Sequence, residues 1–220
     1  MNPGYPNRSI SRILKQLMLL MVLMLPAVPT TTQAAVNCEL NYPASDVARL
    51  FPESDNYKIS YFSFARQGGE PLLRKVEARL GSVPALYAPL NVPYTLYETY
   101  KGGKRIGYIH GVNQKGHYGV LEVFVSLDMK GMIKAFYIQR MAGQWVNKFT
   151  LPKFGKQFVG LTLRDFELYD PVSGKGSGKV AAMTNPAPLA VTDFYGLQRA
   201  VKKNLVLMDE FVYSTQKGKQ

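Results

Sequence analysis

Few residues in this chain have the types and spacing that catalysis or metal binding needs. The only histidines are His110 and His117, and no carboxylate cluster accompanies them, so the sequence predicts no metal site. Neither a G-x-S-x-G nucleophile motif nor a C-x-x-C-H haem motif occurs. Paired catalytic carboxylates cannot be singled out among the 15 acidic residues. An enzyme acting on a small substrate therefore has no residue-level support.

A stretch rich in glycine, serine and lysine, Asp170–Lys179, could place backbone N–H groups around a phosphate. The Walker spacing is not met, because Lys179 is followed by Val180 rather than by serine or threonine. We expect a flexible exposed loop. In the functional alternative, its amides and lysines face a phosphate group.

Four consecutive strands are predicted between Tyr94 and Arg140, with glycine-containing turns between them. The third strand alternates clearly: Leu121, Val123, Val125 and Leu127 share one face, and Phe124 is the apolar exception on the other. The predicted strands are Tyr94–Tyr100, Arg105–Val112, Tyr118–Asp128 and Met132–Arg140.

Helical patterns flank these strands, so the fold class is α+β, a single domain with an antiparallel β-meander packed by a few helices. Before the meander we expect a helix over Asp46–Phe51 capped by Ser45 or Asp46, a strand within Tyr57–Arg66, a helix over Glu70–Leu80 closed by Gly81, and a connection over Ser82–Pro93. After it, Thr192 or Asp193 caps a last helix with an apolar stripe of Phe194, Leu197, Val201, Leu205 and Met208.

The order of several motifs adds to this pattern. They are Asp46–Pro52 with its L-F-P turn, the Gly116-His117-Tyr118-Gly119 turn, the D-x-x-G-x-I hairpin Asp128–Ile133, and the F-x-x-Q-F-x-G segment from Phe154 to Gly160. Together they resemble the FMN-binding domain, found in flavin-carrying subunits of bacterial membrane redox complexes and in related periplasmic proteins. The resemblance covers residues 46–211.

Many members of that family carry a D-x-x-S-G-A-T motif, whose threonine is esterified to FMN phosphate by a separate transferase. The corresponding segment here is Lys179–Thr184, which keeps the threonine but has Ala182 at the glycine position. The resemblance implies that Thr184, Lys175 and Lys179 lie near the phosphate of FMN. Covalent attachment at Thr184 competes with the alternative of an ordinary loop threonine.

The resemblance also implies residues near the flavin ring, after the fourth strand of the meander. These are Arg140, Trp145 and Lys148. A flat, apolar ring system is well stacked by an aromatic side chain. The alternative for Trp145 is a structural one, in which it is a partly buried cap.

The N-terminus has the architecture of a secretory signal. Arg8, Arg12 and Lys15 precede an apolar core over Leu17–Leu25, and Thr32-Gln33-Ala34 offers small residues at the cleavage positions. We expect a signal peptide over residues 1–34, a linker over 35–45 and a basic tail over 212–220. The mature protein is then periplasmic. An uncleaved membrane anchor is the alternative, although the core is shorter than the about 20 residues of a spanning helix.

The chain carries a formal charge of +12, of which the signal contributes +3, leaving +9. Such a surface suits anionic lipid head groups or acidic protein partners. The predicted export and the dispersed positions of the basic residues argue against nucleic acid as a binding partner. The only cysteine, Cys38, cannot form an internal disulfide, and we expect a spare thiol in a poorly ordered terminus. A lipoprotein would need a small residue at the position of Asn37.

Two functions follow as expectations. The first is an exported FMN-binding electron-transfer protein of the bacterial cell envelope, whose partner is a redox or scaffold protein, with peripheral membrane contact. It is an electron carrier or binding protein more than a catalyst, because the chemistry belongs to the cofactor. The second is a flavin-free binding module, or accessory subunit of an envelope complex, that keeps the fold.

Overall fold

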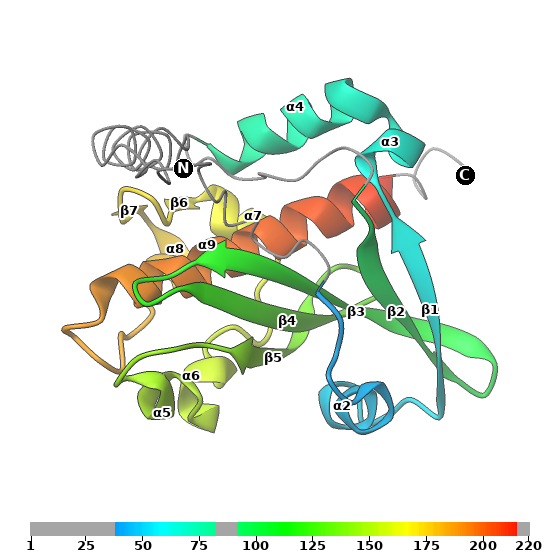
Figure 1. The fold of residues 1–220 in the computed structure, drawn as a ribbon, viewed down its shortest axis with the longest axis horizontal. Helices are drawn as coiled ribbons and strands as arrows, with labels where there is room; N and C mark the ends of the chain where they lie inside the picture. Colours follow the sequence, from blue (N-terminus) through cyan, green and yellow to red (C-terminus); the bar gives the residue numbers. More distant parts are fainter. Residues whose placement is uncertain (1–37, 82–91, 215–220) are drawn as a thin grey trace, which may run out of the picture. The chain divides into compact units, whose positions relative to one another are not determined.

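The computed structural model describes residues 38–81 and 92–214 of the chain. Its centre is a five-stranded antiparallel sheet in which strand order follows sequence order, β1-β2-β3-β4-β5 (Figure 1). The strands are β1 (Asn56–Phe62), β2 (Tyr94–Lys101), β3 (Lys104–Lys115), β4 (Val120–Asp128) and β5 (Ile133–Arg140). The predicted meander and the α+β class are confirmed. The predicted signal, most of the Ser82–Pro93 connection and the end of the tail lie outside the described residues.

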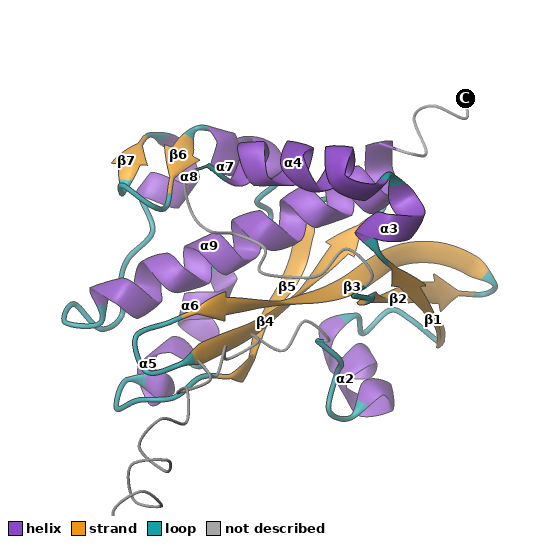
Figure 2. Cartoon of the chain, turned by 45° about the horizontal axis from the view of Figure 1, so that its top comes forward, coloured by secondary structure: helices purple, strands orange, loops and turns teal. Residues whose placement is uncertain are grey.

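Helices and one small hairpin surround this sheet (Figure 2). Before β2 lie α2 (Pro43–Leu50), α3 (Phe64–Gln67) and α4 (Gly69–Leu80). After β5 come α5 (Val146–Phe149), α6 (Pro152–Lys156), α7 (Leu163–Glu167), the hairpin β6 (Tyr169–Asp170) and β7 (Lys175–Gly176), α8 (Gly178–Ala181), α9 (Val191–Met208) and the π-helical turn η1 (Asp209–Tyr213). Among the helices of residues 38–81 and 92–214, none combines the length and apolar character that a membrane span requires.

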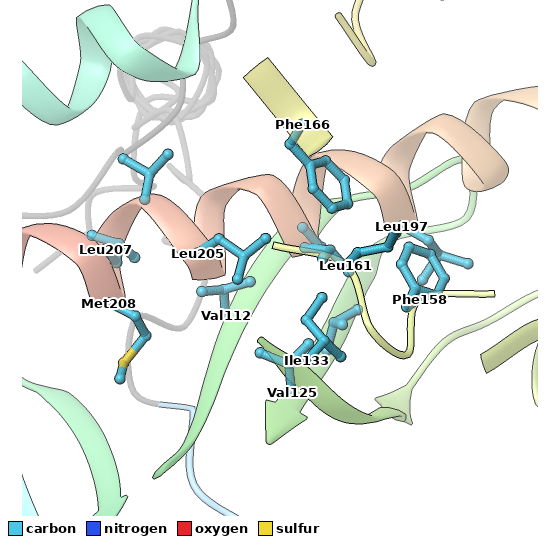
Figure 3. Close-up of a cluster of buried hydrophobic side chains, with 14 of the residues drawn as sticks. Val112, Val125, Ile133, Phe158, Leu161, Phe166, Leu197, Leu205, Leu207 and Met208 are labelled. Atoms are coloured by element: carbon cyan, nitrogen blue, oxygen red, sulfur yellow. The ribbon is translucent and has the colours of Figure 1, made fainter. Parts of the chain in front are cut away.

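The main core lies between α9 and one face of the sheet. Leu197 and Leu205 of α9 are buried, as are Val112 of β3 and Val125 of β4 (Figure 3). The predicted apolar stripe of α9 is therefore core. Phe158, Leu161 and Phe166, from the segment after β5, close the same cluster.

The opposite face of the sheet packs against α2 in a second, smaller core. Phe124, the apolar exception in the predicted pattern of β4, is fully buried there with Phe51 and Ile109. Two glycines of β3 make room for these rings. A Cβ atom at position 107 would overlap Phe51, and a Cβ atom at position 111 would overlap Phe124. Both faces of β4 are thus buried, which accounts for its nearly continuous apolar run.

Several predicted boundaries are wrong. Within the meander, β3 continues to Lys115 instead of ending at Val112, and β4 begins at Val120 instead of Tyr118. The first strand ends at Phe62, because the Ser63 side chain accepts a hydrogen bond from the Arg66 amide and starts α3. The first helix begins at Pro43, so the expected caps Ser45 and Asp46 lie inside it. The last helix begins at Val191, with Asp193 inside its first turn.

Cys38 is not a spare thiol in a poorly ordered terminus. It is 3 % exposed and belongs to the second core with Leu40. The segment that follows is held to the sheet, since the Leu40 amide donates to the Tyr97 hydroxyl at 2.9 Å and the Gln139 side chain bonds to the backbone of Glu39 and Asn41. The folded unit therefore includes residues assigned to the linker.

Candidate functional site

The segment after β5 forms the scaffold of the candidate site. Pro152 occupies the first turn of α6, where its missing N–H has no cost. Phe154 and Phe158 are buried one helical turn apart, and the ring of Phe158 stacks on Phe136 of β5 with centroids 4.3 Å apart. This aromatic packing anchors α6 on the sheet and leaves Gln157 at its outer end.

Gln157 connects this scaffold to Thr184. The Thr184 amide donates to Gln157 Oε1 at 2.7 Å, and Gln157 Nε2 donates to the Thr184 carbonyl at 3.1 Å. The backbone of Thr184 is thus held in both directions, while the residue itself is exposed. Its hydroxyl makes no hydrogen bond with another described residue, so it remains available to a ligand.

The segments on both sides of this connection are cationic. Residues 141–164 contain Lys148, Lys153, Lys156 and Arg164, and residues 171–192 contain Lys175 and Lys179. Asp165 and Asp170 border these segments, and Asp170 is opposite Lys175 in the β6–β7 hairpin. Lys148 on α5, Lys175 on β7 and Lys179 on α8 are exposed, and none pairs with an acid within the described part of the chain. Unpaired cations of one sign attract an anionic group.

The glycine-rich stretch before Thr184 is the β6–β7 hairpin rather than the expected flexible loop. Asp170 organises its turn, accepting hydrogen bonds from the Val172 amide at 2.9 Å and the Ser173 hydroxyl at 2.7 Å. Burial alone would raise the pKa of Asp170, but these bonds outweigh it and lower the pKa. Gly176 has φ +136°, and a Cβ there would overlap the Leu168 carbonyl. Packing within the chain explains this glycine without a phosphate.

The residues expected at the flavin ring are divided between two places. Arg140 lies 3.6 Å from the Glu122 carboxylate. Glu122 alternates with Val123, which is in the main core, so it points to the face that α2 covers. Trp145 is half-buried, packs against the main core and occupies the N-cap position of α5. This placement is the one that the structural alternative for Trp145 describes, a partly buried residue against the core.

Of the six predicted residues, five therefore belong to the side of the sheet that carries α5 to α9. Lys148 and Trp145 are on or beside α5, which is joined to α6 through the Phe149 and Phe154 rings at 5.1 Å. Through Gln157, α6 is in turn joined to Thr184, with Lys175 and Lys179 upstream in the chain. Arg140 is the exception.

Two functional side chains were missed by the sequence analysis. Gln157 is part of the F-x-x-Q-F-x-G motif, and its position between Phe154 and Phe158 indicates a polar side chain that points away from the core. Asp193 was expected to cap α9. Instead it is 2 % exposed and accepts a hydrogen bond from the His117 amide at 2.7 Å, joining the start of α9 to the β3–β4 turn.

A polar pair in the main core contrasts with this exposed site. His110 Nδ1 lies 2.6 Å from Asn204 Oδ1, and the Asn204 amide nitrogen donates to the His110 carbonyl at 3.0 Å. Because that nitrogen donates to a carbonyl, Asn204 Oδ1 must accept a hydrogen bond from the N–H at Nδ1 of His110. Burial lowers the pKa of the His110 imidazole to about 4. This pair is structural, because both residues are buried.

No protein-family model and no curated protein matches the chain at a significant level. The resemblance to the FMN-binding domain therefore depends on the quoted motifs and their order. The phosphate end of FMN fits the chemistry of this segment, which offers the Thr184 hydroxyl and, shortly before it in the chain, the exposed Lys175 and Lys179. The ring end fits less well, because Arg140 pairs with Glu122 and Trp145 is partly occupied by core packing.

Proposed function

We propose that this chain is an exported electron-transfer protein of the bacterial cell envelope that binds FMN non-covalently. The supporting observation is exposed Thr184, on a backbone held by Gln157 and preceded in the chain by the exposed Lys175 and Lys179. Bound FMN would supply reversible redox chemistry. The contribution of Lys175 and Lys179 is to neutralise the phosphate, and that of Trp145 is to present an aromatic edge to the ring.

Non-covalent binding is proposed because the attachment motif is altered. Ala182 stands where the resembling family has glycine, and it adopts φ −81° and ψ −1°, a conformation open to any residue. No residue of the described chain other than glycine has a positive φ. The segment before Thr184 thus forms an ordinary helix end, without the special backbone that a glycine there would allow.

The test is a UV–visible spectrum of the mature protein purified from the periplasm of a flavin-replete host, before and after acid precipitation. Flavin bands that move to the supernatant support the proposal, and bands that stay in the pellet indicate a covalent bond. The T184V variant should lower FMN occupancy, whereas T192V, which changes another exposed threonine, should not. A colourless protein that takes up no added FMN contradicts the proposal.

The altered segment itself favours a second candidate, a flavin-free binding module that keeps the fold. Here the discriminating variant is A181S/A182G/M183A, which rebuilds the S-G-A part of the family motif before Thr184. Covalent flavin in the rebuilt protein after co-expression with a flavin transferase, together with no bound flavin of either kind in the original, would favour the module. A stable partner recovered with flavin-free protein would support it further.

A further inference from the structure

Exposed apolar and basic side chains alternate at the outer surface of α6 and on the loop before α9. Leu189 is 84 % exposed, Leu151 is 51 % exposed and Val159 is 48 % exposed. Lys153 and Lys156, also exposed, lie between Leu151 and Val159 in the chain. We call these five residues the basic–apolar face.

Two contacts hold the parts of this face on the same side of the domain. The Gln157–Thr184 hydrogen bonds join the end of α6 to the loop that carries Leu189. The ring of Phe154 in α6 lies 6.3 Å from that of Phe194 in the first turn of α9, just after this loop. Both views place the loop before α9 near α5 and α6 (Figures 1 and 2).

This face lacks the negative charges found at the other end of the sheet. The nearest acid in the chain, Asp193, is buried and bonded to the His117 amide. At the opposite end, exposed Lys101 and Lys104 flank a turn whose Gly102 amide donates to the Asp55 carboxylate at 2.6 Å. The two ends therefore differ in charge pattern, although both carry lysines.

We propose that the basic–apolar face docks on an anionic lipid bilayer. Isolated, strongly exposed leucine and valine side chains can enter the interfacial region of a bilayer, while the neighbouring lysines stay at the head groups. Each lysine near an anionic surface contributes about 1 kcal/mol. An acidic protein partner would satisfy the lysines but would leave the protruding Leu189 without a complementary surface. This proposal does not depend on bound flavin.

Trp145, the only tryptophan of the chain, is the N-cap residue of α5, the helix just before Leu151 in the chain, and provides the readout. The full-length protein is mixed with vesicles of phosphatidylcholine alone, or with phosphatidylglycerol added, and binding is measured by co-sedimentation. Brominated phosphatidylcholine in the anionic vesicles should quench Trp145 fluorescence. Tethering through the N-terminal residues alone would give binding without quenching, which would overturn the proposal.

Matched variants distinguish binding through the basic–apolar face from general electrostatic attraction of the basic protein to anionic vesicles. K153Q/K156Q should weaken binding to anionic vesicles roughly 25-fold, because two lysines each contribute about fivefold. K101Q/K104Q removes the same charge at the opposite end of the sheet and should leave the affinity almost unchanged. L189Q should reduce the quenching, and I59Q, on an exposed position of β1, should not. Equal losses in both lysine pairs would overturn the proposal, and so would a protein that ignores anionic vesicles and binds an acidic protein instead.

Discussion

The side-chain amide of Gln157 holds the peptide of Thr184 from both sides, accepting from its N–H at 2.7 Å and donating to its carbonyl at 3.1 Å. These residues lie 27 positions apart in the chain. The connection fixes the segment between α8 and α9, in which Thr184 carries the one hydroxyl. It is therefore the structural basis of the proposed phosphate site.

Replacing this amide tests the connection. Q157A removes both bonds and should release the backbone around Thr184, with a cost of about 1 kcal/mol in the free energy of unfolding. Hydrogen exchange of the Thr184 amide should accelerate. Q157E keeps the acceptor and loses the donor, so its exchange rate should fall between those of the wild type and Q157A. Unchanged exchange in Q157A would show that the loop holds itself.

His110 predicts how stability changes in weak acid. Its pKa is about 4 in the folded protein because of burial, below the ordinary value of 6.5. The unfolded chain therefore binds the proton first, and stability is lost as the pH falls from 6.5 to 4. The full loss is about 3 kcal/mol. Urea unfolding across this range measures it.

Two further measurements test whether His110 causes this pH dependence. The H110F variant should lose this part of the pH dependence, whatever its stability at neutral pH. In the folded wild type, the His110 ring proton signal should not shift above about pH 5, with the H117Q variant used to assign it. A His110 signal that titrates near pH 6.5 would contradict a buried neutral imidazole.

Glu210 should cause a second loss of folding stability, at a lower pH than His110. Its carboxylate, in the π-helical turn after α9, accepts a hydrogen bond from Lys75 of α4 at 2.8 Å and pairs with Arg79. Burial alone would raise the pKa of Glu210, but the Lys75 and Arg79 bonds outweigh it and lower the pKa. The unfolded state thus takes up the proton first. Stability from this group is complete above the ordinary value of 4.5 and is lost as the pH falls below it.

The corresponding variant is E210Q, which should lower the free energy of unfolding at pH 7 by about 2 kcal/mol. The matched control is E70Q, which changes an exposed pair between Glu70 and Arg74 at 3.2 Å and should cost less than about 0.5 kcal/mol. Chemical unfolding at pH 7 measures both. Equal costs would mean that α4 is not anchored through Glu210.

Cys38 should react slowly in the folded protein. Burial, with a smaller effect of the Glu122 charge, raises the pKa of its thiol to about 12, so little thiolate forms at neutral pH. Ellman's reagent should therefore label it only after urea unfolds the chain, and C38S should give no signal in either state. Rapid labelling of the native protein would mean that residues 38–41 detach from the sheet.

Local sequence patterns predicted much of the fold. The alternation of β4, the glycine turns and the stripe of α9 each depend on neighbours within a few residues, and the meander, α4 and α9 followed from them. Local signals were less reliable at the ends of elements. Thr192 and Asp193 satisfy a capping pattern, yet Asp193 is used by the His117 amide, a partner 76 positions away.

The candidate site also divides into features that were predicted and contacts that only the tertiary structure shows. The resemblance to the FMN-binding domain singled out Thr184, Lys175 and Lys179 for the phosphate and Lys148 for the ring, and all four are exposed in the structure. The sequence could not show that Gln157 reaches Thr184, that Arg140 pairs with Glu122 on the other face, or that Cys38 is buried in the second core. Periodicity determines which way a side chain points within its own element. Which partner it meets is decided only when separate elements pack together.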